Sequence, residues 1–353
     1  MKKRVAVLGA TGLVGQRFVT LLANHPWFEL TTLTASEGSV GRRYVDVVRW
    51  LVEKPIPEEL CNVTLAALNA DALVRDGVEI AFSALPTEVA RKVEVELARK
   101  GVVVISNASS MRLEPDIPLV NPEVNADHLG VIEQQRRIRS WDGALIKIPN
   151  CTTAILTLSL KPLMDEFGVN VVIASSMQAV SGAGLSGLPS MLIIDNLIPY
   201  IEGEEEKIES ESRKILGSLG HRSIELSDVI ISTSCHRVMV LEGHTIAVFA
   251  GLRRDSSPEE VLRAMSEFRT NKIKDLKLPT APERPIVIRN EPDRPQPRLD
   301  RLEGGGMSVV VGRVRGDAAL RGVKYEVLGH NTVRGAAGTG VLIAEVIKER
   351  NLI

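Results

Sequence analysis

Residues 4–15 have the sequence RVAVLGATGLVG, in which a short apolar strand runs directly into a glycine-rich loop. Beyond the loop, the apolar residues at positions 14, 18, 21 and 22 recur at helical spacing, and Pro26 ends this pattern. The apolar stretch 30–35 then predicts a second strand. The chain therefore opens with a strand–helix–strand unit, which is typical of parallel sheets covered by helices.

The same alternation continues to about residue 149. Buried strands are predicted at 78–83 and 102–106, with a helix over about 87–100 between them. These elements predict an α/β fold with a Rossmann-type parallel sheet domain, followed by an α+β domain with a mostly antiparallel sheet. The strands of this second domain are expected at 171–174, 176–180, 229–233, 237–241, 245–250 and 308–313, and its helices at about 152–167, 206–217 and 258–268.

Three further segments carry weaker signals. Six prolines within 278–299 predict an ordered but irregular surface or interface excursion, and 335–353 predicts a final helix. The charge run GEEEK at 203–207 lies at a helix start and by itself predicts a solvated face.

The composition narrows the classes of partner. The chain has 353 residues, of which 44% are hydrophobic, so it is long enough for two cores. The net charge of −1 and an aromatic content of 3% argue against nucleic acid, and no apolar run has the length of a membrane span. The three cysteines lie far apart, which predicts neither a disulfide nor a metal site and fits a cytoplasmic protein with small-molecule partners.

The glycine-rich loop predicts a dinucleotide site. Its glycines permit a tight turn and the close approach of a pyrophosphate to the start of a helix, although they could also serve the turn alone. Hydroxyl groups at the end of the second strand and the Arg42-Arg43 pair favour NADP over NAD, while Glu37 argues the other way. The predicted cofactor-binding residues of this part are Gly9, Thr11, Gly12, Leu13, Val14, Ser36, Ser39 and Ser83.

A second informative stretch is ALIKIPNCTTA at residues 144–154. It predicts a strand, a break at Pro149-Asn150 and then Cys151 at the start of an apolar helix. A thiol at a helix N-terminus favours the thiolate form, which is a nucleophile. A free cysteine can also be a small buried apolar residue, and the local sequence leaves the two interpretations balanced. His236-Arg237 and His244 flank a predicted strand hairpin, and for either histidine taken alone the local sequence favours a structural role.

Taken together, the motifs resemble those of the aspartate-semialdehyde dehydrogenase family, in its archaeal and fungal-type branch, over essentially the whole chain. The order and spacing of the motifs carry the resemblance. They are the loop 9–15, SSMR at 109–112, NPEVN at 121–125, PNCT at 149–152, QAVSGAG at 178–184, Glu211-x-x-Lys214, Arg237-x6-His244 and NTVRGAAG at 331–338.

The resemblance implies a role for each matching residue. Cys151 would form the acyl-enzyme, His244 would be the general acid or base, and Gln178 would orient the thiol and substrate. Substrate binding would fall to Arg237 for the α-carboxylate, Glu211 for the ammonium group, Lys214 and Arg112 for the phosphate, and Asn150 beside the nucleophile. Ser181, Gly182 and Asn331 would contact the nicotinamide side of NADP(H).

The resemblance also implies an NADPH-dependent reduction of aspartyl phosphate to aspartate semialdehyde plus phosphate, in lysine, threonine and methionine biosynthesis. The cofactor domain would comprise 1–149 and 331–353, and the catalytic and dimerisation domain would comprise 150–330, in a homodimer or homotetramer. Two alternatives stay open: a malonyl-CoA reductase of the same superfamily, and a non-catalytic NADP-binding regulator. Without the resemblance, Glu211 and Lys214 would be interpreted as a surface ion pair of i,i+3 spacing.

Overall fold

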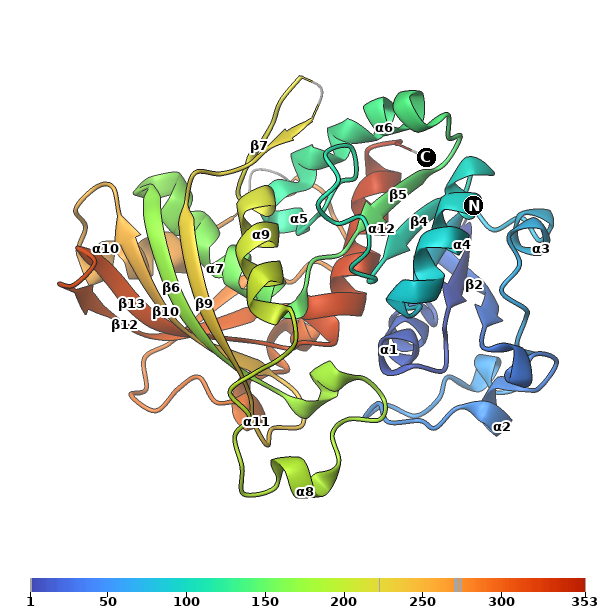
Figure 1. Ribbon diagram of the computed structural model, residues 1–353, viewed down its shortest axis with the longest axis horizontal. Helices are drawn as coiled ribbons and strands as arrows, with labels where there is room; N and C mark the ends of the chain where they lie inside the picture. The colour runs from blue at the N-terminus through green and yellow to red at the C-terminus, as the bar shows by residue number, and fades with distance from the viewer. Residues whose placement is uncertain (1, 222, 270–272, 274, 353) are drawn as a thin grey trace.

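The computed structural model describes residues 2–221, 223–269, 273 and 275–352, and it contains two large sheets side by side (Figure 1). Met1 and Ile353, the outer limits of the predicted first domain, lie outside the described residues. The first sheet is parallel, as the sequence predicted, and its strand order is β2-β1-β3-β4-β5. Its strands are β1 (Lys3–Leu8), β2 (Phe28–Thr34), β3 (Ile80–Ser83), β4 (Val103–Ser106) and β5 (Ala144–Lys147).

Helices cover both faces of the first sheet. Alternate residues of each strand point to opposite faces, so Val5 and Val7 join one core while Ala6 and Leu8 join the other. The first core is closed by α1 (Leu13–Leu22) and the C-terminal helix α12 (Gly338–Glu349), and the second by α3 (Ala70–Arg75) and α4 (Thr87–Arg99). The last helix of the chain thus returns to the sheet with which the chain begins (Figure 1).

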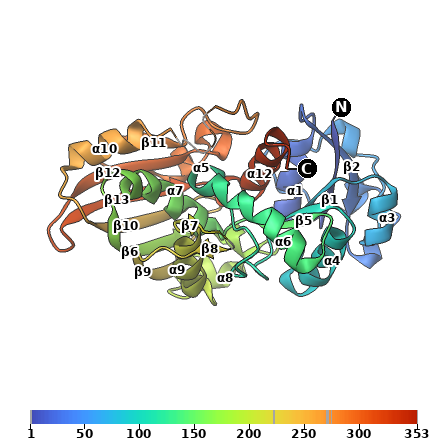
Figure 2. The ribbon, with the colours of Figure 1, turned by 90° about the horizontal axis from the view of Figure 1, so that it is seen from above.

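The second sheet has the order β11-β12-β13-β10-β6-β9. It is mixed, because β11–β12 and β6–β9 pair in parallel while the other three pairings are antiparallel. Helices α7 (Cys151–Glu166) and α10 (Pro258–Ser266) pack on one face, and α9 (Glu204–Ile215) lies along β9 (Figure 2). The strands are β6 (Val169–Gln178), β9 (Ile230–Arg237), β10 (His244–Leu252), β11 (Ile286–Arg289), β12 (Val309–Asp317) and β13 (Gly322–Gly329).

Several predictions for the second sheet were wrong in detail. The two strands expected at 171–174 and 176–180 correspond to the single strand β6. Of the strand expected at 237–241, Arg237 ends β9 and 238–241 belong to a loop. No hairpin joins β9 to β10, because β6 lies between them and the loop crosses its end. Strand β13 was missed, and the proline-rich stretch contains β11 and α11 (Pro297–Asp300). Within the described residues, no helix combines the length and the apolar character that a membrane span requires.

Candidate active site

A cavity of about 740 Å³ opens between the two sheets. Its walls include 12–14, 84–87, 107–109 and 149–151, which are the segments that follow β1, β3, β4 and β5. Ligands of open parallel sheets bind at this carboxyl edge, beside the point where the strand order reverses. A surface depression of similar size beside α10 is lined mainly by charged side chains and lacks a cysteine or histidine, so the chemistry points to the cavity between the sheets.

The glycine loop has the shape that a dinucleotide requires. A Cβ atom on Gly15 would lie 2.2 Å from the carbonyl oxygen of Gly9, so the loop folds this tightly only with glycine there. Gly9 itself has a φ of +78°, which favours glycine. Gly12 caps α1 and, with Leu13 and Val14, faces the cavity. Free backbone N–H groups at this helix start are therefore open to a phosphate, and the loop fits the predicted cofactor.

Three other residues of the predicted cofactor set lie apart from the cavity. Ser36 and Ser39 flank a short exposed helical turn after β2, near Arg42, and neither lines the cavity wall. The Ser83 hydroxyl is fully buried and donates to Glu94 Oε1 at 2.7 Å, and the cofactor contact of this residue stays a prediction. The Ser83 side chain therefore supports the sheet edge.

Cys151 is the first residue of α7 and lies beside His244. Asn150 caps the helix, since its Oδ1 accepts hydrogen bonds from the N–H groups of Thr152 and Thr153 at 2.9 and 3.1 Å. The Cys151 Sγ is 3.2 Å from His244 Nε2. A Cβ on Gly335 would come within 2.6 Å of the Cys151 Cβ, so this glycine allows the C-terminal segment to close over the thiol.

A backbone contact fixes the tautomer of His244. The N–H of Ala179 donates to His244 Nδ1 at 3.1 Å, so in the neutral ring the proton is on Nε2 and points toward the sulfur. Burial and the charge of Arg237 lower the pKa of His244 to about 3, which keeps the ring neutral. His244 is therefore arranged as a hydrogen-bond donor to Cys151 and to any group formed there.

The Cys151 thiol is protonated in this arrangement of charges. Burial, followed by the negative charge of Glu204, raises the pKa of Cys151 to about 12, although Arg237 and the N–H of Thr152 act in the opposite direction. The helix N-terminus favours the thiolate in the expected direction, but the loss of hydration on burial outweighs it. A change in local charge is needed to release the nucleophile.

Three predicted residues lie in a row across three strands. Gln178 ends β6, Arg237 pairs with it in register on β9, and His244 begins β10 on the other side. Arg237 Nη1 donates to the carbonyl of Ala179 at 2.7 Å, and it contacts no acidic side chain among the described residues. The guanidinium lines the cavity near Gly182, where a Cβ would lie 2.5 Å from Nη1. Because β6 lies between β9 and β10, the three side chains come together at the same end of the sheet.

Glu211 and Lys214 do not line the cavity, and their contact with substrate stays a prediction. Lys214 Nζ is buried and donates to the carbonyls of Arg112, Glu114 and Ile117 at 2.8, 2.7 and 2.7 Å. Glu211 accepts from Arg112 Nη1 and from the backbone N–H of Asn150, both at 2.7 Å. All three Nζ donors of Lys214 and both oxygens of Glu211 therefore have partners within the protein. Arg112 does line the cavity, and its buried Nε has no partner among the described residues.

Glu204 and Lys207, which the sequence analysis did not select, occupy the cavity wall instead. Glu204 lies two turns before Glu211 on α9 and is only 7% exposed, so the solvated face predicted for this segment was wrong. Its Oε1 accepts from Asn150 Nδ2 at 2.9 Å and from Gln178 Nε2 at 3.0 Å. The signal was present in the sequence, because E-x-x-K occurs twice in this helix.

The parallel sheet with its glycine loop and the paired thiol and imidazole define a class, the NAD(P)-dependent oxidoreductases that act through a cysteine. Within this class, residues 4–132 match the model of the semialdehyde dehydrogenase NAD binding domain, and 160–334 match that of the semialdehyde dehydrogenase dimerisation domain. The chain therefore belongs to the semialdehyde dehydrogenase family.

Named relatives agree with this assignment. A curated aspartate-semialdehyde dehydrogenase of Archaeoglobus fulgidus is 51% identical over 353 residues, which is the full length of both chains. The crystal structure of an aspartate-semialdehyde dehydrogenase with NADP from Candida albicans superposes with a TM-score of 0.92 at 38% identity, covering 99% of this chain and 100% of that one. A malonyl CoA reductase (NADP) of Metallosphaera sedula is 38% identical over 354 residues, covering 99% of this chain and 98% of its own.

Proposed function

We propose that the protein catalyses the reversible NADPH-dependent reduction of L-aspartyl 4-phosphate to L-aspartate 4-semialdehyde and phosphate, through a thioester on Cys151. The observation that carries the proposal is the contact of 3.2 Å between the Cys151 sulfur and His244 Nε2, in a cavity whose other wall is the dinucleotide loop. Such a site supports acyl transfer to sulfur next to a hydride donor. The higher identity to the semialdehyde dehydrogenases than to the malonyl CoA reductase supports the aspartyl substrate.

Each charged group of aspartyl phosphate has a matching side chain in the cavity. Arg237 suits the α-carboxylate, since a guanidinium can bind both oxygens. Glu204 suits the ammonium group, because it is a buried carboxylate without a cationic partner among the described residues. Arg112 and Lys207 suit the phosphate. Glu211 and Lys214 then act indirectly, by holding Arg112 and the loop that carries it.

The charges also explain how the thiol is activated. Burial is the main cause of the raised Cys151 pKa and the charge of Glu204 the second, so an ammonium group bound to Glu204 removes the second cause and shifts the balance toward the thiolate. The sulfur then forms a bond to the acyl carbon while the carbon–oxygen bond to phosphate breaks, and phosphate leaves with the electron pair. The result is a thioester.

His244 contributes as a donor in both halves of the reaction. Its Nε2–H can donate to the oxygen that gains negative charge when the acyl carbon becomes tetrahedral. A bound nicotinamide cofactor would supply a hydride to that carbon. Cleavage of the carbon–sulfur bond then releases the aldehyde and returns a thiolate to Cys151. The thiol proton leaves on the phosphate as hydrogen phosphate when the thioester forms, and the returning thiolate takes up a proton again in the free site, so His244 need not accept the sulfur proton.

The residues available to hold NADP are the loop 12–14 for the pyrophosphate and Ser181, Gly182 and Asn331 toward the nicotinamide. Asn331 bridges the two walls, since its Nδ2 donates to Ser181 Oγ and its Oδ1 accepts from the N–H of Gly243, each at 2.8 Å. The exposed turn with Ser36, Ser39 and Arg42 is our candidate for the 2′-phosphate of NADP. The domain limits of 149/150 and 330/331 stay predictions.

We also propose that the protein is a homodimer or homotetramer in the cytoplasm. The sheet face opposite α7 exposes Ile173 and Ile230, which are 46% and 67% exposed. The match of 160–334 to a dimerisation domain supports pairing through this part of the chain.

An assay of the reverse reaction tests the proposed function. We expect NADPH absorbance to rise when purified protein is mixed with aspartate semialdehyde, phosphate and NADP, and not when phosphate is left out. With NADPH and malonyl-CoA we expect no oxidation. Turnover of malonyl-CoA without turnover of aspartate semialdehyde would instead support the alternative reductase, and the absence of both would support a non-catalytic regulator.

Arg237→Lys tests the carboxylate contact. Lysine keeps the charge but cannot form the two-pronged pair, so we expect kcat/KM for aspartate semialdehyde to fall by about a hundredfold, mainly through a higher KM. Steady-state kinetics measure both parameters. An unchanged KM would contradict the contact between Arg237 and the substrate carboxylate.

A further inference from the structure

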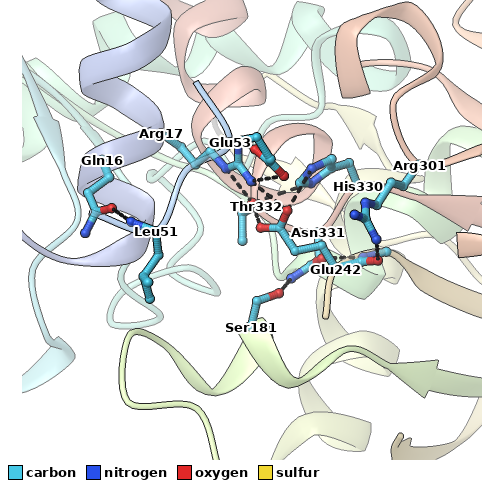
Figure 3. Close-up of polar contacts among 11 residues, drawn as sticks. Gln16, Arg17, Leu51, Glu53, Ser181, Glu242, Arg301, His330, Asn331 and Thr332 are labelled. Carbon is cyan, nitrogen blue, oxygen red and sulfur yellow. Dashed lines mark hydrogen bonds and ion pairs between the residues drawn. The ribbon is translucent and has the colours of Figure 1, made fainter. Parts of the chain in front are cut away.

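A buried network of charged side chains joins helix α1 to the loop that carries His244 (Figure 3). Arg17 on α1 donates from Nη2 to Glu242 Oε2 and from Nη1 to Glu53 Oε2, both at 2.6 Å. The side chain of Glu242 is 5% exposed, whereas that of Glu53 is 45% exposed. Arg17 therefore pairs with one exposed carboxylate, that of Glu53, and with one buried carboxylate, that of Glu242, which lies on the side of the active site.

Two residues of the C-terminal segment complete the surroundings of Glu242 (Figure 3). The Thr332 hydroxyl accepts a hydrogen bond from Arg17 Nε and donates one to Glu242 Oε1, each at 3.0 Å. His330 Nε2 is 3.3 Å from Glu242 Oε2. Although burial raises the pKa of Glu242, its contacts with His330 and Arg17 together hold that pKa well below the usual range, so the carboxylate is charged.

The Glu242 side chain is the charged anchor of a loop that is otherwise held through its backbone. The N–H groups of Val180 and Ser181 donate to the carbonyls of Val240 and Leu241 at 2.8 and 3.2 Å. Gly243, the next residue, has a φ of +101° and is held through its N–H by Asn331. His244 follows immediately, with Nε2 at 3.2 Å from the Cys151 sulfur. A shift of about 1 Å at a reacting group can cost a hundredfold in rate, so the anchoring of this loop bears directly on catalysis.

We propose that Glu242 is a positioning residue for His244, and that Arg17 ties it to the dinucleotide-binding helix. His244 is then aligned with Cys151 only while α1 is docked against the segment 330–332. The proposal rests on the proposed function for its kinetic meaning, because it assigns a supporting residue to the same cysteine–histidine pair.

A cation site or a purely stabilising ion pair would account for this cluster less well. Glu53, Glu242 and His330 lie close enough to share a cation. However, the Arg17 guanidinium already stands between the two carboxylates as their positive partner. A buried ion pair is also weak evidence for stability, since its desolvation can cancel its attraction, and a role in placement fits the cluster better.

A matched pair of variants tests the proposal. Glu242→Gln keeps the side-chain shape and removes the charge, while Glu53→Gln removes the second acidic partner of Arg17. For Glu242→Gln we expect kcat to fall by about ten- to a hundredfold with KM within about twofold of the parent value. For Glu53→Gln we expect both parameters within about twofold, because this carboxylate is exposed and lies outside the loop.

A second measurement needs no substrate and so stands apart from the proposed function. Alkylation of Cys151 by iodoacetamide at neutral pH reports the Nε2–H contact, since that donor favours the thiolate. We expect slower alkylation in Glu242→Gln than in the parent protein and in Glu53→Gln, at equal thermal stability of the two variants. Equal alkylation rates in all three proteins would overturn the positioning role even if the enzyme assay failed for another reason.

A double-variant cycle identifies the partner. If Arg17 acts through Glu242, then Arg17→Gln combined with Glu242→Gln should lower kcat no further than either change alone. If the kcat of the double variant instead fell by the product of the two single losses, the link between Glu242 and α1 would be overturned. Should Glu242→Gln fail to fold, Arg17→Lys replaces it: it keeps the charge but shortens the reach, and normal alkylation and kcat in that variant would likewise contradict the proposal.

Discussion

Cys151→Ser is expected to abolish turnover while leaving NADPH binding close to that of the parent protein. Serine at the start of α7 keeps the helix cap and nearly the same volume, but its hydroxyl is far less acidic than the thiol, whose pKa is already raised to about 12. His244, held as the Nε2–H tautomer, does not supply the base that would activate it. We therefore expect kcat to fall by more than about a thousandfold.

Two measurements check this result. Steady-state assays give kcat, and titration of NADPH fluorescence gives the dissociation constant, which we expect to change by less than about twofold because the loop 12–14 is untouched. Cys61→Ser is the matched control, since Cys61 is half-buried in the first domain and donates only to the Pro57 carbonyl at 3.6 Å. Substantial activity in Cys151→Ser, or equal losses in both variants, would refute the nucleophile.

The parts of the fold that the sequence predicted correctly are local. The unit of β1, loop and α1 follows from apolar spacing and glycines within one continuous stretch, and α7 follows from the break at Pro149-Asn150. The errors concern pairing between distant segments. Strand β13 has alternating Val323, Tyr325 and Val327, so its pattern was readable, but nothing local shows that β6 separates β9 from β10.

The same distinction applies to the site. Cys151, His244 and Arg237 could be selected from the motifs that carry the family resemblance. In the structure each of them lies at the end of a helix or strand. The choice between the two E-x-x-K pairs of α9 could not be made, since Glu204 and Glu211 are two turns apart and lie on the same side of the helix. Only the packing of α9 along β9 decides which of them faces the cavity.

The two glutamates can be separated by experiment. For Glu204→Gln we expect kcat/KM with aspartate semialdehyde to fall by about a hundredfold, because the buried partner of the substrate ammonium is lost. With succinate semialdehyde, which lacks that ammonium, we expect little further loss, so the preference between the two aldehydes collapses. Glu211→Gln should weaken the hold on Arg112 and slow both substrates alike, leaving the preference intact.

The thiol itself should respond to Glu204→Gln in the opposite direction. Removing a negative charge beside the sulfur favours the thiolate, so the pKa of Cys151 falls and alkylation at neutral pH becomes faster, by about tenfold for each unit of pKa. The variant would thus be a poorer enzyme with a more reactive nucleophile, a combination that a general loss of structure does not produce. Glu211→Gln should leave the alkylation rate unchanged. If instead Glu211→Gln removed the preference for aspartate semialdehyde and Glu204→Gln did not, the ammonium site would belong to the second E-x-x-K pair, as the family resemblance first implied.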